Sequence, residues 1–284
     1  MDLKGVPNAS AAMEKLGNPR YRTVPMLYRV EDGGVFEVPD QKVILDFGSL
    51  PVGRASDRYG IYQPVHMLEM AYDIASTTGG HVKNFHFGRG NSIATIEVGF
   101  PGSVNIGKRG VDPVDVGGRL YNSFDGTGSA RFEVTMWRKV CSNGMYGLRK
   151  EARACVRHTH SVYNRMEEAI RAAGYIQNKL PALIENLSRL TEVGVTPSQK
   201  REFIERLIPG EGTRSERIRG AISTWEESGP GSKIYPNTAW NLYNGVTAYV
   251  THELAVGRNG RDRARLGAGV TLEERALELL KEMK

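Results

Sequence analysis

Hydrophobic and polar positions alternate with a period of two along much of the first half of the chain. Such alternation is typical of β-strands, in which successive side chains point to opposite faces. Strands are predicted at residues 22–30, 42–47, 82–87, 93–100 and 151–158, and the alternation is clear in the last two runs. Pro25 lies in the first run and has no backbone N–H, so we expect an edge strand there. Apolar residues three and four apart between Pro64 and Gly79 predict a helix.

A β-hairpin is predicted between Leu120 and Cys141, with its turn at residues 125–128. One face of its second strand is apolar and consists of Ala130, Phe132, Val134, Met136 and Val140. The opposite face consists of Arg131, Glu133, Thr135, Trp137, Lys139 and Cys141. We expect the first face to be core and the second to be a basic surface. Arg138 falls in the apolar register, so it lies at the end of the sheet or beside a β-bulge.

Helical periodicity begins at Val162 and dominates the rest of the chain. Pro181 lies inside the first stripe and is expected to kink or split that helix. Residues 196–199, 213–216 and 271–274 match the capping box and predict three helix N-termini. Residues 101–118, rich in Gly, Asp and Pro, are expected to be irregular.

Strands followed by helices predict an α+β fold: an antiparallel, hairpin-rich sheet packed on a long helix, with an α-helical C-terminal half. We expect an α+β core domain with the basic hairpin over residues 1–190 and a helical C-terminal region over 191–284.

Positive charge is concentrated in the predicted hairpin and the strand after it. The 284-residue chain has a net charge of +6, and residues 131–157 alone carry +5. The basic residues there are Arg131, Arg138, Lys139, Arg149, Lys150, Arg153 and Arg157. Trp137 and Tyr146 lie among them. Such a mixture suits binding of single-stranded nucleic acid, because phosphates attract cations and bases stack on aromatic rings. A second basic cluster, Arg258, Arg261, Arg263 and Arg265, would add contacts.

Composition narrows the class of protein. The chain is 40% hydrophobic and 25% charged, as in ordinary globular proteins. No apolar run approaches the roughly 20 residues of a membrane helix, and the first ten residues lack the apolar stretch of a signal peptide. Two cysteines do not make a disulfide framework. We therefore expect a cytoplasmic protein that does not bind membranes.

No active site can be assembled from the sequence. Cys141, Cys155, His158 and His160 do not have the spacing of zinc ligands, and residues 88–92 lack the Lys of a P-loop. We predict no metal and no cofactor. Cys141 is the one candidate nucleophile, because Cys–His pairs make nucleophiles, but no oxyanion element accompanies it. A protein without enzymatic activity is favoured.

Three segments resemble a known family. They are residues 138–145, residues 156–160 and residues 237–252, in that order along the chain from about Pro64 onward. Together they resemble the phage- and plasmid-borne domain of unknown function 932. The resemblance implies a protein of mobile elements in bacterial cells without an assigned enzymatic activity. Its layout is similar to the β-β-β-α core of single-strand annealing recombinases, which is an analogy of fold.

These observations predict a phage or plasmid protein that binds and anneals single-stranded DNA in recombination or replication without catalysis, as a homo-oligomeric ring or filament. The expected nucleic-acid-binding residues are Arg131, Trp137, Arg138, Lys139, Tyr146, Arg149, Lys150, Arg153 and Arg157. Two alternatives stay open. One is an anti-defence or assembly protein whose basic face binds a host or phage protein, and the other is a cysteine-dependent enzyme that acts on nucleic acid.

Overall fold

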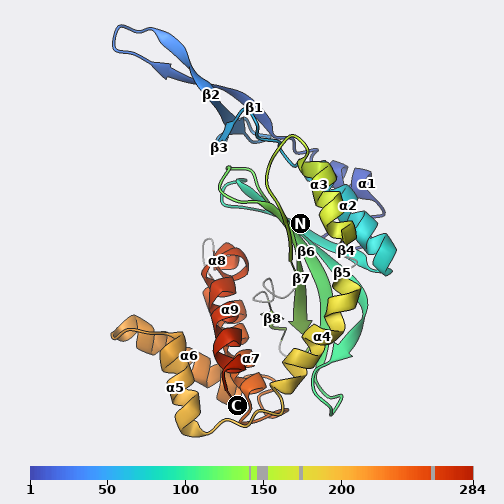
Figure 1. The fold of residues 1–284 in the computed structure, drawn as a ribbon, viewed down its shortest axis with the longest axis vertical. Coiled ribbons are helices and arrows are strands. Elements are labelled where there is room, and N and C mark those ends of the chain that lie inside the picture. Colours follow the sequence, from blue (N-terminus) through green and yellow to red (C-terminus); the bar gives the residue numbers. More distant parts are fainter. Residues whose placement is uncertain (141, 146–152, 173–174, 257–259, 284) are drawn as a thin grey trace. The chain divides into compact units, whose positions relative to one another are not determined.

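The computed structural model describes residues 1–140, 142–145, 153–172, 175–256 and 260–283 (Figure 1). Its strands are β1 (Arg22–Arg29), β2 (Val35–Leu45), β3 (Pro51–Ser56), β4 (His81–Gly88), β5 (Ile93–Asn105), β6 (Pro113–Ser123), β7 (Ala130–Arg138), β8 (Gly144–Met145) and β9 (Arg153–Val156). Its helices are α1 (Ala9–Lys15), α2 (Pro64–Thr78), α3 (Val162–Ala172), α4 (Tyr175–Arg189), α5 (Pro197–Leu207), α6 (Thr213–Ser228), α7 (Ala239–Tyr249), the π-helix η2 (Val250–Leu254), α8 (Gly260–Leu266) and α9 (Ala268–Lys281). Antiparallel sheets combined with helices confirm the predicted α+β class.

The chain divides into two compact units. The first contains Met1–Pro101, Gly117–Glu133 and Arg153–Gly174, and the second contains Gly102–Val116, Val134–Ala152 and Tyr175–Lys284. Strands β5, β6 and β7 contribute residues to both units. A domain boundary near residue 190 stays a prediction. None of the described helices is long and apolar enough to cross a bilayer.

A small sheet in the first unit has the strand order β1-β2-β3 (Figure 1). β1 is an edge strand, as Pro25 predicts, and its register with β2 shifts between Pro25 and Leu27. β2 pairs with β3 only from Gln41 to Leu45. Beyond that point β1 and β2 continue together, with Tyr28 opposite Phe36, as a two-stranded ribbon.

The larger sheet has the order β4-β5-β6-β7-β8, and β9 pairs with β7. β6 and β7 are neighbours joined at residues 124–129, so the predicted hairpin is confirmed. The expectation that residues 101–118 are irregular is wrong, because β5 continues to Asn105 and β6 begins at Pro113. The Gly and Pro residues obscured the alternation of buried Val114 and Val116 with half-buried Asp115.

The two faces of β7 are less different than predicted. Phe132, Val134 and Met136 are buried, as expected for the core face. On the opposite face, however, Glu133 is 1% exposed and Thr135 is 0% exposed. The expectation of an open basic surface along this strand is therefore wrong for its central part, since both faces are covered.

In the helical half, several predicted helix boundaries differ from the observed ones. Pro181 lies inside α4, which continues on both sides of it, so this residue does not split the helix. Thr196 begins α5 with the expected capping box: its hydroxyl accepts from Gln199 N, and its own N–H donates to Gln199 Oε1 at 2.9 Å. The other two capping boxes are wrong. α6 has Gly212 as its N-cap, and Thr271 lies inside α9.

Two helical glycines provide a matched test of packing. A Cβ built on Gly245 of α7 would lie 2.9 Å from the carbonyl oxygen of Ile222 in α6, whereas a Cβ on Gly220 would have no neighbour within 4 Å. Gly245→Ala should lower the free energy of unfolding by about 1–3 kcal/mol through overpacking. Gly220→Ala should raise it by about 0.5–1 kcal/mol, because alanine is the better helix former. Urea denaturation of both variants tests this pair, and equal effects would contradict the close approach of α6 and α7.

Candidate nucleic-acid interface

Among the predicted contact residues whose side chains the structure describes, Arg138 is the most completely buried. It is 1% exposed at the end of β7. Its Nε lies 2.7 Å from Asp112 Oδ1 and 2.9 Å from Asp112 Oδ2, and its Nη2 donates to the carbonyl oxygen of Gly231 at 3.2 Å. A buried guanidinium held in this way has no path to a phosphate. Arg138 is therefore a structural residue. It is the last residue of β7, in line with the first of the two positions that its register allowed, the end of the sheet or a β-bulge.

Arg131 is also engaged inside the protein. Its Nε lies 2.7 Å from Glu133 Oε1, and its guanidinium lies 3.6 Å from the centre of the Tyr121 ring. Glu133 also pairs with Arg119, whose Nη2 is 2.6 Å from Glu133 Oε2. The Arg131 side chain is only 16% exposed. Its charge is largely committed to this buried cluster.

Lys139 keeps more freedom than the two arginines. It is exposed, and its Nζ lies 3.2 Å from Asp115 Oδ1. Exposed ion pairs of this kind contribute about 0–1 kcal/mol, so a ligand can displace the partner. Trp137 is half-buried on β7 opposite Gly144.

Several predicted positions lie outside the described residues. They are Cys141, Tyr146, Arg149, Lys150, Arg258 and the side chains of Arg153 and Arg261. The backbone of Arg153 pairs with Glu133 in the β7–β9 ladder. Cys155 is an exposed free cysteine on the same strand.

Arg157, one of the predicted cations, is exposed and lies next to an aromatic ring along the chain. The following residue, His158, stacks on Tyr59, with ring centres 4.7 Å apart and planes at 15°. Tyr59 donates from its hydroxyl to the carbonyl oxygen of Ser123 at 2.9 Å, and His158 Nδ1 lies 3.1 Å from Gly60 O. The residue before Tyr59 is the exposed Arg58. We name Arg58, Tyr59, Arg157 and His158 the paired-ring cluster.

Close backbone approach fixes this cluster. A Cβ on Gly60 would lie 2.0 Å from the carbonyl oxygen of Thr159, so only glycine allows the loop to approach residues 158–160. Burial raises the pKa of Tyr59 above its ordinary value, and the negative charge of Asp125 adds to the effect. Burial also lowers the pKa of His158, against the opposing effects of Gly60 O and Asp125. Both rings are therefore neutral at pH 7. Sequence reasoning missed Arg58 and Tyr59, because they lie in an aperiodic loop distant along the chain.

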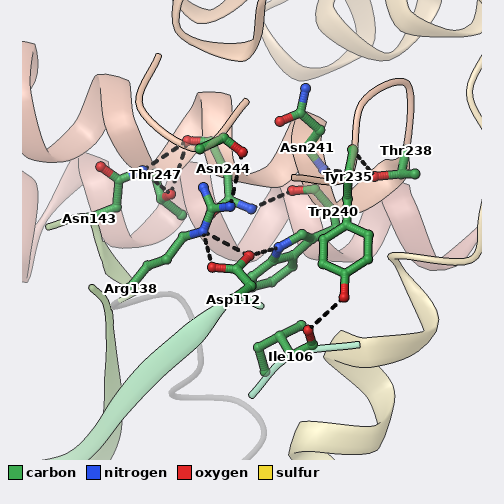
Figure 2. A network of polar contacts seen from close by, with 11 residues as sticks. Ile106, Asp112, Arg138, Asn143, Tyr235, Thr238, Trp240, Asn241, Asn244 and Thr247 are labelled. Atoms are coloured by element: carbon green, nitrogen blue, oxygen red, sulfur yellow. Dashed lines mark hydrogen bonds and ion pairs between the residues drawn. The ribbon is translucent and has the colours of Figure 1, made fainter. Parts of the chain in front are cut away.

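In the second unit, a buried polar network centres on Asp112 (Figure 2). Asp112 Oδ2 accepts from Trp240 Nε1 at 2.7 Å while the same carboxylate holds Arg138. Trp240 is fully buried, as is Asp112. The carboxylate thus joins the loop before β6 to the end of β7 and to α7. The apolar register of Arg138 was the one sequence signal that pointed to this network.

Asn143, directly before β8, forms a second connection to α7. Its Nδ2 lies 3.2 Å from Asn244 O and 3.3 Å from Thr247 Oγ1 (Figure 2). Its Oδ1 lies 2.9 Å from His252 Nε2. Asn143 is 1% exposed, so these contacts are buried inside the second unit. The preceding residue, Ser142, has a positive φ of 53°.

The π-helix η2 places two further groups against this segment. Gly144 N donates to Thr251 Oγ1 at 3.1 Å, and the His252 ring stacks on Trp225 with centres 5.0 Å apart. Trp225 Nε1 donates to Glu253 Oε1 at 2.7 Å. The segments 138–145 and 237–252 therefore satisfy each other's polar groups, which makes them a structural core element of this unit.

Removing one partner of the Asp112–Arg138 pair is expected to cost the fold several kcal/mol, because the other charge is left buried without a counterion. Asp112→Asn keeps the shape of the side chain but leaves the Arg138 charge without a counterion, which should lower the free energy of unfolding by about 3–5 kcal/mol. Arg138→Met should cost a similar amount, and the double variant should be more stable than the sum of the two losses predicts. Urea denaturation followed by circular dichroism measures all three. A loss below about 1 kcal/mol for Asp112→Asn would match an exposed pair and contradict this burial.

His158 should make stability depend on pH. Its pKa is lowered in the fold, so the unfolded chain takes up a proton near pH 6.5 that the folded protein refuses. Stability is thus complete above about pH 7 and falls as the pH drops toward the folded pKa, by at most about 1.4 kcal/mol per pH unit. His158→Gln should remove this contribution, and His81→Gln, at an exposed position, serves as the control. Unfolding free energies between about pH 7.5 and pH 5 test it, and an unchanged slope in His158→Gln would contradict the burial.

Comparison with known proteins gives one match. No curated protein and no solved structure matches the chain. The family model of the domain of unknown function 932 (DUF932) matches residues 51–270, which is more than half of the sequence. The match includes the paired-ring cluster and the Asp112 network, and it leaves out β1 and β2. The chain therefore belongs to the DUF932 family.

Proposed function

We propose that this protein binds single-stranded DNA through the paired-ring cluster and promotes annealing of complementary strands. The observation that carries the proposal is that each of two stacked rings, Tyr59 and His158, directly follows an exposed arginine. A single strand presents phosphates at one side and unstacked bases at the other. Cations beside flat rings provide contacts to both without reading sequence.

The ion pairing of the cations supports the proposal. Within the described part of the chain, neither Arg58 nor Arg157 forms an ion pair, whereas Arg131, Arg138 and Lys139 have acidic partners. A phosphate that approaches Arg58 or Arg157 does not have to displace a carboxylate. These two arginines are therefore the primary phosphate contacts, and Lys139 is a secondary one.

The chemistry required is modest. Annealing breaks and forms no covalent bond, so it needs neither a nucleophile nor a metal; it needs a strand held extended with its base edges free to pair. As part of the same proposal, the protein acts as a homo-oligomer in the bacterial cytoplasm, in recombination or replication of a mobile element.

Loss of the two arginines should weaken binding and reduce its salt dependence. Arg58→Ala combined with Arg157→Ala should raise the Kd for a labelled oligothymidine by about tenfold or more. It should also reduce the slope of log K against log salt by about 1.4, because each phosphate contact on a single strand contributes about 0.7. Fluorescence anisotropy across a salt series measures both quantities.

The matched control removes the same charge elsewhere. Arg201 and Lys233 are exposed in the second unit, and Arg201→Ala with Lys233→Ala should leave affinity within about twofold, which is near the error of such a comparison. An equal loss in both double variants would show that net charge alone matters. Binding of the unaltered protein without salt dependence would sink the proposal.

A further inference from the structure

The ribbon formed by β1 and β2 is the blue extension in Figure 1. Its far end carries exposed apolar side chains. We name residues 27–37 the arm. Within the described residues, no third strand pairs with it, since β3 stops opposite Gln41. Its exposed apolar side chains are Leu27 (59%), Tyr28 (49%), Val35 (51%) and Phe36 (52%).

The arm is poorly stabilised by itself. Tyr28 and Phe36 are directly opposite and lie on one face, with ring centres 5.8 Å apart. An isolated two-stranded ribbon is marginally stable in water at best. Two adjacent exposed rings on one face of an unsupported ribbon mark an interaction site, whereas Leu27 and Val35 lie on the opposite face.

The charge of the arm indicates which partner it fits. It contains Arg29 and three acids, Glu31, Asp32 and Glu37, so its net charge is −2. Since the chain has a net charge of +6, the remainder carries +8. The net negative charge repels phosphates, which makes a nucleic acid a poor partner for the arm. A second copy of the chain, which is strongly basic outside its own arm, attracts it.

A groove in the second unit has the matching chemistry. It lies between α4 and α9, has a volume of about 440 Å³, and is lined by Leu183, Leu187, Leu190, Val193, Leu277, Leu280 and Met283. Arg189 and Lys281 also border it. The apolar lining accepts aromatic side chains such as Tyr28 and Phe36. Arg189 Nη2 lies 2.7 Å from Glu185 Oε1 in an exposed ion pair, which another acid can displace. The two cations thus complement the acids of the arm.

We propose that the arm of one copy docks in the α4–α9 groove of a second copy. The two surfaces are different patches, so the contact is head-to-tail, and repetition closes a ring or continues as a filament. The inference names the contact for the proposed homo-oligomer and does not depend on nucleic-acid binding. It also gives a role to a segment that lies outside the DUF932 match.

Site-specific cross-linking tests the contact. Two variants are prepared in a Cys141→Ser, Cys155→Ser background: Phe36→Cys in the arm, and Asn186→Cys at the groove, where Asn186 is an exposed lining residue. When the two are mixed under an added oxidant without nucleic acid, a disulfide-linked dimer containing one copy of each should form. Phe36→Cys mixed with Thr213→Cys, an exposed position on α6, should give no such dimer.

The other outcomes each overturn the proposal. No dimer in the Phe36→Cys and Asn186→Cys mixture excludes the groove. A dimer from Phe36→Cys alone shows arm-to-arm contact. In a chain that carries both cysteines, a monomeric cross-linked product without dimers shows that the arm closes on its own groove.

Light scattering of the protein without nucleic acid provides a second readout. Phe36→Asp should shift the mass from oligomer to monomer. Val35→Asp makes the same charge change on the opposite face of the ribbon and should retain the oligomer. Both positions are exposed, so unchanged circular dichroism is expected. A monomeric Phe36→Asp protein that still binds oligothymidine would separate this contact from the proposed function, and an oligomeric one would refute the docking.

Discussion

Burial of the Arg138 guanidinium is the constraint on which the arrangement of the second unit depends. Removing a carboxylate and a guanidinium from water costs several kcal/mol per ion, and only close pairing with further hydrogen bonds offsets it. Asp112 provides that pairing, and Trp240 Nε1 satisfies the carboxylate in turn. The loop before β6, the end of β7 and the start of α7 must therefore keep one geometry. Asn143 forms a second buried polar contact one turn further along α7, where its Nδ2 donates to Asn244 O.

Because buried arginines are paired with acids, the net charge of a sequence segment differs from the charge that its surface presents to a ligand. Arg131 is held by Glu133 and lies over Tyr121, so it contributes little to the surface field. Arg138 contributes less still. Exposed Arg58, distant along the chain, contributes more. Some residues of a dense basic run thus form buried ion pairs that hold strands together. Residues from other segments of the chain contribute to the surface that a polyanion can contact.

The proposed contacts have a common consequence for a strand-binding protein. A single paired-ring cluster would contact few nucleotides, so its affinity for one strand would be modest. Copies joined head to tail through the arm would place many such clusters along one strand. Each further contact is then intramolecular, and the overall affinity rises without any new chemistry at the site.

The sequence by itself determined the secondary structure where the period was unambiguous. Alternation located the β6–β7 hairpin, Pro25 made β1 an edge strand, and the 196–199 capping box began α5. These features depend on neighbours along the chain, so local pattern suffices. The segment at 101–118 was mispredicted because Gly and Pro obscured a strand whose partners lie elsewhere.

Only the tertiary structure decided which polar residues are structural. The sequence placed Arg138 in a core register but could not name Asp112 as its partner, 26 residues away. It could not bring Arg58 and Tyr59 to Arg157 and His158, because that approach depends on Gly60 accepting a backbone at a distance no side chain allows. Pairings of this kind are set by three-dimensional packing and the cost of buried charge. Neither packing nor the cost of buried charge produces a periodic pattern in the sequence.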